Sequence, residues 1–171
     1  MYLARYFRSI GIQTYVGYLF HHESPLRNER HVCQRIATAA HRIAKGSKEI
    51  IELGDISVRK EWTYAGDIAE GIMTLIEQDE VFEVVIGSGQ SYSIENWLDE
   101  CFKLVNKDWR HYVVCRENFK SDYPIMVSNP VTINSIGWHA TTTIAELAKL
   151  MIDHQETKQS KSPDFSVNFI H

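Results

Sequence analysis

Short apolar runs alternate with helix-like segments along most of this chain, and this alternation limits the folds open to it. Residues 12–20 and 82–86 are rich in β-branched and aromatic residues and carry little charge. Such runs are typical of strands buried on both faces of a parallel sheet. Between them, residues 32–45 repeat apolar positions every three or four residues and stop before Gly46, which predicts an amphipathic helix. The order of elements predicts an α/β fold.

The remaining elements continue the pattern. Strands are predicted at residues 49–53 and 112–115. Asp67 is a candidate N-cap for a helix that carries Ile68, Ile72, Met73 and Ile76. Ser93 is a candidate N-cap for a helix with an apolar face made of Ile94, Trp97, Leu98, Cys101, Phe102 and Val105. Thr143 and Glu146 form a capping-box pattern that opens a last helix, with Leu147, Met151 and Ile152 inward. Periodicity disappears after Asp153, so we expect one domain over residues 1–153 and a polar, mobile tail over residues 154–171.

Composition excludes several classes of function. The 18 basic and 22 acidic residues are mixed and give a net charge of -4, so no broad basic field is available for nucleic acid. No run of about 18 apolar residues and no signal-peptide pattern occurs, so we expect no membrane span. Cys33, Cys101 and Cys115 are odd in number and widely spaced, which argues against a disulfide framework or a zinc site and favours the cytoplasm.

A few clusters could carry chemistry. His21, His22 and Glu23 lack the spacing of a metal site, because adjacent strand residues point to opposite faces. Gly87-Ser88-Gly89 follows a strand and precedes a helix, as a phosphate cradle would, but Tyr92 occupies the place of the third glycine of a dinucleotide fingerprint. The sequence therefore favours an ordinary strand-to-helix turn.

Two groups of cations are candidates for an anion site. Arg27, Arg30 and Arg35 follow the His22 turn, where guanidinium groups could bind phosphates or simply lie on the surface. Arg59 and Lys60 lie close to Trp62 in a predicted loop, a combination suited to a diphosphate or a base, and equally to a solvated loop with a half-buried Trp. Spacing alone carries the argument no further.

Four segments, in order, resemble the GDP-mannose 4,6-dehydratase family of the extended short-chain dehydrogenase/reductase superfamily, over about residues 6–153. Residues 17–27 resemble its G-x-L-F-N-H-E-S-P-R-R strand and turn. Residues 53–67 resemble L-G-N-x-x-x-x-R-D-W-x-x-A-x-D, residues 86–89 resemble V-I-A-T-G, and residues 136–143 resemble L-G-W-x-x-x-T-T. The implied fold is the last strands of an NAD(P)-binding Rossmann-type domain together with the C-terminal substrate-binding subdomain.

The resemblance also implies site residues. His22 and Arg27 would approach NADP, whereas Val32, Arg35 and Lys60 would line the pocket for GDP-mannose or a related nucleotide sugar, with Lys120 a further phosphate candidate. Arg35 stands where the family has Lys and Lys60 where it has Arg, so one bidentate guanidinium becomes a point charge.

The family's G-x-x-G-x-x-G turn and catalytic Tyr-x-x-x-Lys pair are not found in these 171 residues. Without them hydride transfer cannot be organised, so we expect a truncated chain that is inactive alone and assign no catalytic residue. If Met1 is the true start, strand 12–20 also loses its neighbours, which predicts self-association or a missing N-terminal half.

Three hypotheses therefore stand. The first is a truncated sugar-nucleotide-binding chain. The second is the C-terminal half of a split NADP-dependent GDP-mannose 4,6-dehydratase, with the fingerprint on another polypeptide. The third is a non-catalytic interaction module that uses its apolar sheet edge as a contact surface.

Overall fold

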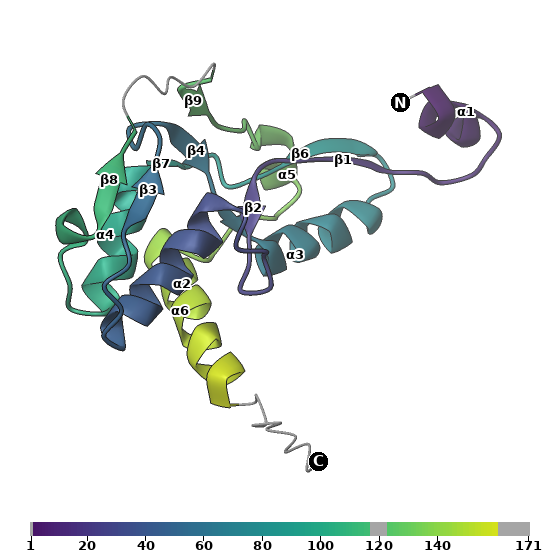
Figure 1. Ribbon diagram of the computed structural model, residues 1–171. Helices are drawn as coiled ribbons and strands as arrows, with labels where there is room; N and C mark the ends of the chain where they lie inside the picture. The colour runs from purple at the N-terminus through teal and green to yellow at the C-terminus, as the bar shows by residue number, and fades with distance from the viewer. Residues whose placement is uncertain (1, 117–122, 161–171) are drawn as a thin grey trace, which may run out of the picture.

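A computed structural model describes residues 2–116 and 123–160 (Figure 1). Its helices are α1 (Tyr2–Ser9), α2 (Val32–Ala44), α3 (Ala65–Ile76), α4 (Ile94–Leu104), the 3-10 turn η1 (Trp109–His111), α5 (Val131–Ser135) and α6 (Ile144–Ser160). Its strands are β1 (Val16–Leu19), β2 (His22–Glu23), β3 (Ile51–Leu53), β4 (Arg59–Glu61), β5 (Thr63–Tyr64), β6 (Glu83–Ile86), β7 (Ser91–Ser93), β8 (Val113–Cys115) and β9 (Ile125–Met126).

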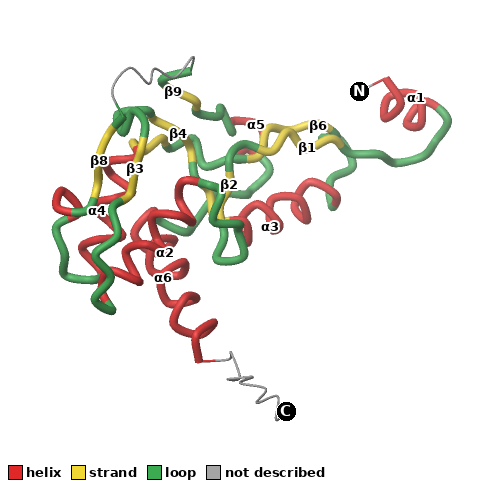
Figure 2. Tube along the Cα trace, viewed as in Figure 1, coloured by secondary structure: helices red, strands yellow, loops and turns green. Residues whose placement is uncertain are grey.

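The strands form small and mostly parallel sheets. β1 pairs with β6, β2 with β5 and β3 with β8, in each case parallel. β4 lies between β7, which is antiparallel to it, and β9, which is parallel. Figure 2 shows these short strands in yellow and the helices in red along the chain. The α/β class with parallel strands that the sequence predicts is confirmed.

The larger of two hydrophobic cores lies where α2, α4 and α6 pack together (Figure 1). Ile36, Trp97, Phe102 and Met151 are almost fully buried there. Ser93 caps α4 as predicted, because its hydroxyl accepts from the Asn96 amide while the Asn96 side chain accepts from the Ser93 amide. Local sequence signals thus define this helix completely.

The smaller core lies between α3, β6 and α5. It contains Ile68, Leu75, Ile86 and Trp138. Gly71 lets α3 approach closely, since a Cβ at this position would lie 2.8 Å from Ile86 Cγ2 and 3.0 Å from Trp138 Cε2. Of the apolar residues that the sequence analysis named on this helix, Ile68 is buried in the smaller core, whereas Ile72, Met73 and Ile76 are exposed.

Two predicted helix boundaries also differ. Tyr64, and not Asp67, is the N-cap of α3, and Asp67 lies buried in its first turn. α6 continues past Asp153 to Ser160, and Gln155 is buried on it, although polar residues hide the helical period there. The capping box of Thr143 and Glu146 is confirmed. The domain boundary at residue 153 stays a prediction.

The strand predicted at residues 12–20 is present but shorter and less buried. Tyr18 is 42% and Leu19 44% exposed, so burial on both faces was wrong. The reason is that β6 is the single strand paired with β1 in the part of the chain that the structure describes. Helix α1 lies beyond it at the end of an extended connection (Figure 1) and is tied back through Arg5 and Arg8, which pair with Glu83.

Within residues 2–116 and 123–160, no helix has both the length and the apolar character needed to cross a membrane. Nor do these residues gather three or more metal-ligating side chains in one place.

Candidate functional site

The turn that follows β1 carries the first candidate residues. β2 pairs with β5, so His22 lies beside Thr63 and Glu23 beside Tyr64. The His22 ring is oriented by its Nδ1, which donates to the Phe20 carbonyl over 2.9 Å. This hydrogen bond holds the Nδ1 edge of the ring against the backbone.

His22 and Arg27 line one common hollow of about 300 Å³, which we call the His22 hollow. Its other lining residues are Leu19, Phe20, His21 and Met126. Arg27 donates to His31 Nδ1 over 3.2 Å, while its buried Nε has no hydrogen-bond acceptor among the described residues. A guanidinium beside an imidazole and apolar side chains can bind a phosphate-bearing ligand that also carries a ring.

Val32, Arg35 and Lys60 line a second hollow of about 250 Å³, which we call the Lys60 hollow. Leu53, Gly54, Asp55, Val58, Trp62 and Ile94 complete its walls. Val32 and Arg35 come from the first turn of α2, and Lys60 comes from β4. The structure therefore brings together the three substrate candidates within the described residues, from segments about 25 residues apart in sequence. Lys120, the fourth, lies outside the described residues.

The two hollows are neighbours. Met126, which lines the His22 hollow, is the strand partner of Lys60 on β4. Burial lowers the pKa of His21, and the charges of Lys60 and Arg27 lower it further. The charge of a cation from each hollow thus reaches His21, which places the two hollows side by side.

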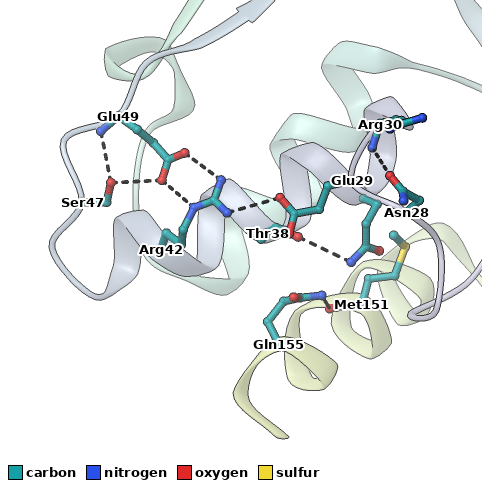
Figure 3. Close-up of polar contacts among 10 residues, drawn as sticks. Asn28, Glu29, Arg30, Thr38, Arg42, Ser47, Glu49, Met151 and Gln155 are labelled. Carbon is teal, nitrogen blue, oxygen red and sulfur yellow. Dashed lines mark hydrogen bonds and ion pairs between the residues drawn. The ribbon is translucent and has the colours of Figure 1, made fainter. Parts of the chain in front are cut away.

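A third hollow, of about 420 Å³, lies on the other side of Arg35 and is larger, but its arginines are engaged. Arg42 makes two bonds to Glu49, of 2.9 and 2.8 Å, and one of 3.3 Å to Glu29 (Figure 3). Arg116 pairs with Glu52 over 2.6 Å. The Arg35 guanidinium donates to the Glu52 carbonyl over 3.0 Å and forms no ion pair within residues 2–116 and 123–160. The paired carboxylates make this hollow a poor anion site.

The Gly87-Ser88-Gly89 turn already holds an anion that belongs to the protein. Glu61 is fully buried, and its carboxylate accepts hydrogen bonds from the backbone amides of Ser88 and Ser128 and from the Thr63 hydroxyl. The Gly89 amide donates to the Ser128 hydroxyl. Because these amides are satisfied internally, the turn is structural and does not fit a phosphate. It leads into β7 and not directly into a helix.

A second buried carboxylate joins two of the sequence segments that carried the resemblance. Asp67 accepts from the Thr141 amide over 3.0 Å, and from the Thr142 amide and hydroxyl over 2.8 and 2.9 Å. The Asp67 carbonyl accepts from the Trp138 indole. Asp67 therefore fastens the segment that precedes α6 onto α3.

Sequence reasoning assigned no role to Glu23, which is buried beside Arg27, or to Met126. Glu23 lies in a polar stretch of the sequence, so no local pattern indicated its burial, which follows from the pairing of β2 with β5. Nothing in the sequence indicated Met126, since its place depends on the pairing of β9 with β4.

Comparison with known proteins identifies a family model and relatives that match this chain. A family model described as GDP-mannose 4,6 dehydratase matches residues 1–151. GDP-mannose 4,6 dehydratase 1 of Arabidopsis thaliana is 28% identical over 157 residues, which cover 89% of this chain and 43% of that protein. The GDP-mannose 4,6 dehydratase of Dictyostelium discoideum is 26% identical over 80% of this chain and 44% of its own length. The chain thus spans less than half of the length of these relatives.

Solved structures agree on the fold. RMD from Pseudomonas aeruginosa, complexed with NADPH, superimposes with a TM-score of 0.81 at 17% identity, over 90% of this chain and 52% of the other. The dTDP-glucose 4,6-dehydratase of Bacillus anthracis, in complex with NAD, gives 0.76 at 12% identity, over 92% and 49%. These likenesses confirm the expected fold, which the chain shares over about half the length of each of these solved structures.

Proposed function

The chain belongs to the GDP-mannose 4,6-dehydratase family, and we propose that these residues form the sugar-nucleotide-binding part of such a protein. Val32, Arg35 and Lys60 hold the nucleotide diphosphate of GDP-mannose or a related nucleotide sugar in the Lys60 hollow. His22 and Arg27 contact NADP from the neighbouring His22 hollow.

The observation that carries this proposal is the convergence of Arg35 and Lys60 on one hollow. Neither side chain forms an ion pair among the described residues, whereas the nearby Arg42 and Arg116 are both paired with glutamates. Two cations with free donors on facing elements can each form charge-assisted bonds with a diphosphate. Val32 and Trp62 supply apolar surface beside them.

The test is calorimetric titration of the 171-residue protein with GDP-mannose. A charge-assisted hydrogen bond contributes about 1.5 to 3 kcal/mol, so we expect Arg35→Ala or Lys60→Ala to weaken binding about tenfold or more. Arg35→Lys keeps the charge and should retain part of the affinity. Higher salt should weaken binding to the wild type more than to either alanine variant, since screening acts on charges that the variants lack.

Two variants serve as controls. Arg30→Ala removes an exposed arginine two residues before α2 that lines neither hollow, and Lys103→Ala removes an exposed lysine on α4. Arg42 is unsuitable as a control, because its bonds to Glu49 and Glu29 hold the end of α2 (Figure 3). Equal affinity in the wild type, both hollow variants and both controls would refute the proposed pocket.

We further propose that the 171-residue polypeptide alone does not dehydrate GDP-mannose. The described site offers cations and an imidazole, and no tyrosine in the sequence has a lysine four residues later. NADP, when bound, supplies hydride transfer; the residues here bind and orient. Formation of the 4-keto-6-deoxy product by the rigorously purified protein would contradict this proposal.

A second candidate, an interaction module, rests on the exposed strand β1. Its Tyr18 and Leu19 offer apolar surface at the edge of a two-stranded sheet. This hypothesis predicts self-association or capture of a partner without nucleotide affinity. A monodisperse monomer by light scattering that still binds GDP-mannose would eliminate it.

A further inference from the structure

Glu23 is a buried carboxyl group that pairs with Arg27, one of the residues that line the His22 hollow. It is 5% exposed, and its Oε2 lies 3.7 Å from Arg27 Nε. Neither of these two atoms has a hydrogen-bond partner within the described residues. The two groups therefore attract each other through charge but do not satisfy each other.

The surroundings offer Glu23 little other support. His22 precedes it on β2 and turns its ring to the Phe20 carbonyl, and Tyr64 is its strand partner on β5. On α2, Cys33 is fully buried, and the charge of Glu23 adds to the burial that raises the pKa of its thiol. Lys60 acts on Cys33 and His21 from β4. Burial raises the pKa of Glu23 to about 7, against the opposing charge of Arg27.

We propose, building on the proposed function, that Glu23 takes up a proton from solvent when an anionic ligand binds at Arg27. The ligand phosphate and the Glu23 carboxylate are two anions on either side of one guanidinium. Since Glu23 is buried and its Oε2 accepts no hydrogen bond, it depends on Arg27 for stabilisation of its charge. A phosphate that shares the guanidinium removes part of that stabilisation, and the neutral carboxyl becomes the favoured form.

Glu23 thus acts as an internal competitor for Arg27 and as a positioning residue, because it acts on ligand through the guanidinium. Thermodynamic linkage fixes the direction in which ligand affinity changes with pH. Binding that takes up one proton weakens as the pH rises above the pKa of the free protein, by up to about tenfold per pH unit. Glu23→Gln mimics the neutral form, so it should bind the anion about as tightly at pH 8 as at pH 6.

The experiment follows the Glu23 carboxyl directly, by 13C NMR of protein labelled at the glutamate side-chain carboxyl. The Glu23 resonance is identified by its loss in Glu23→Gln. Titration from pH 4.5 to 9 is performed without ligand and with millimolar NADP+. We expect the midpoint to rise by at least about half a pH unit with NADP+ in the wild type and not in Arg27→Ala. Glu52, exposed on β3, should show an unchanged midpoint.

The outcomes separate the two proposals. NADP+ binding that is lost in Arg27→Ala, but that leaves the Glu23 midpoint unchanged, would overturn this inference and leave the proposed function intact. No NADP+ binding at pH 6 would overturn the NADP contact and this inference together. A ligand-free arm gives a second measurement: the Glu23 midpoint should rise in Arg27→Ala, and an unchanged midpoint would show that the two groups are not coupled.

Discussion

Replacement of Glu61 tests the internal-anion account of the Gly87 turn. The carboxylate has no exposure and accepts three hydrogen bonds, two from backbone amides and one from the Thr63 hydroxyl. In Glu61→Ala the Ser128 amide, which is buried, loses its partner at 2.8 Å. The Ser88 amide keeps the Thr63 hydroxyl at 3.2 Å and loses only its better acceptor.

The magnitude follows from these contacts. An orphaned buried amide costs about 1 to 3 kcal/mol, and a weakened one adds about 1 kcal/mol. With the lost packing of the side chain, we expect the free energy of unfolding of Glu61→Ala to fall by about 3 to 4 kcal/mol. Glu61→Gln should lose about 2 kcal/mol, because an amide presents one acceptor oxygen and turns its donor group toward a second donor.

The assay is urea unfolding at pH 7, followed by tryptophan fluorescence, since Trp62 is adjacent in sequence. Glu52→Ala is the matched control: it removes an equally charged residue whose pair with Arg116 is largely exposed, so its loss should be below about 1 kcal/mol. If Glu61→Ala costs no more than Glu52→Ala, the carboxylate does not hold the turn and the argument fails.

Three further predictions concern stability. Burial raises the pKa of Glu23 to about 7 from the value of 4.5 expected in the unfolded chain. The free energy of unfolding should therefore fall by up to about 3 kcal/mol as the pH rises from 4.5 through 7. Urea unfolding of Glu23→Gln should not show this decrease. Gly71→Ala should lower the free energy of unfolding by about 1 to 3 kcal/mol in the same assay, because the new Cβ meets Ile86 and Trp138. This cost outweighs the higher helix propensity of alanine. Glu70→Ala, on the exposed face of α3, should change the free energy of unfolding little. Asp67→Ala removes the acceptor of three donors and should lower the melting temperature by about 6 to 12 °C in calorimetry; a shift under about 2 °C would contradict its role as a tether.

Where local chemistry determines an element, the sequence was sufficient to predict it. The Ser93 cap and the Thr143 capping box are satisfied within three residues, so both helix starts are confirmed. Asp67 was mistaken for a cap because its partners lie more than 70 residues away, at Thr141 and Thr142. The exposure of β1 also depends on which strands lie beside it, and no local pattern contains that information.

The candidate site, too, was predictable from the sequence only in part. Motif resemblance predicted that Val32, Arg35 and Lys60 belong together, and they share one hollow. Their role in binding stays a prediction. The resemblance did not distinguish paired from unpaired cations, because Arg42 looks like Arg35 in sequence, and only the positions of Glu49 and Glu29 separate them.

The Asp67 tether has a consequence for how the molecule unfolds. Asp67 belongs to the helix of the smaller core, and the threonines that it holds lead directly into α6 of the larger core. One core can therefore open while the other stays folded only if the buried Asp67 carboxylate first loses its three hydrogen-bond donors. Such a joint makes separate opening of the two cores unfavourable, so amide protons in α3 and in the first turns of α6 should exchange with solvent through one shared opening event.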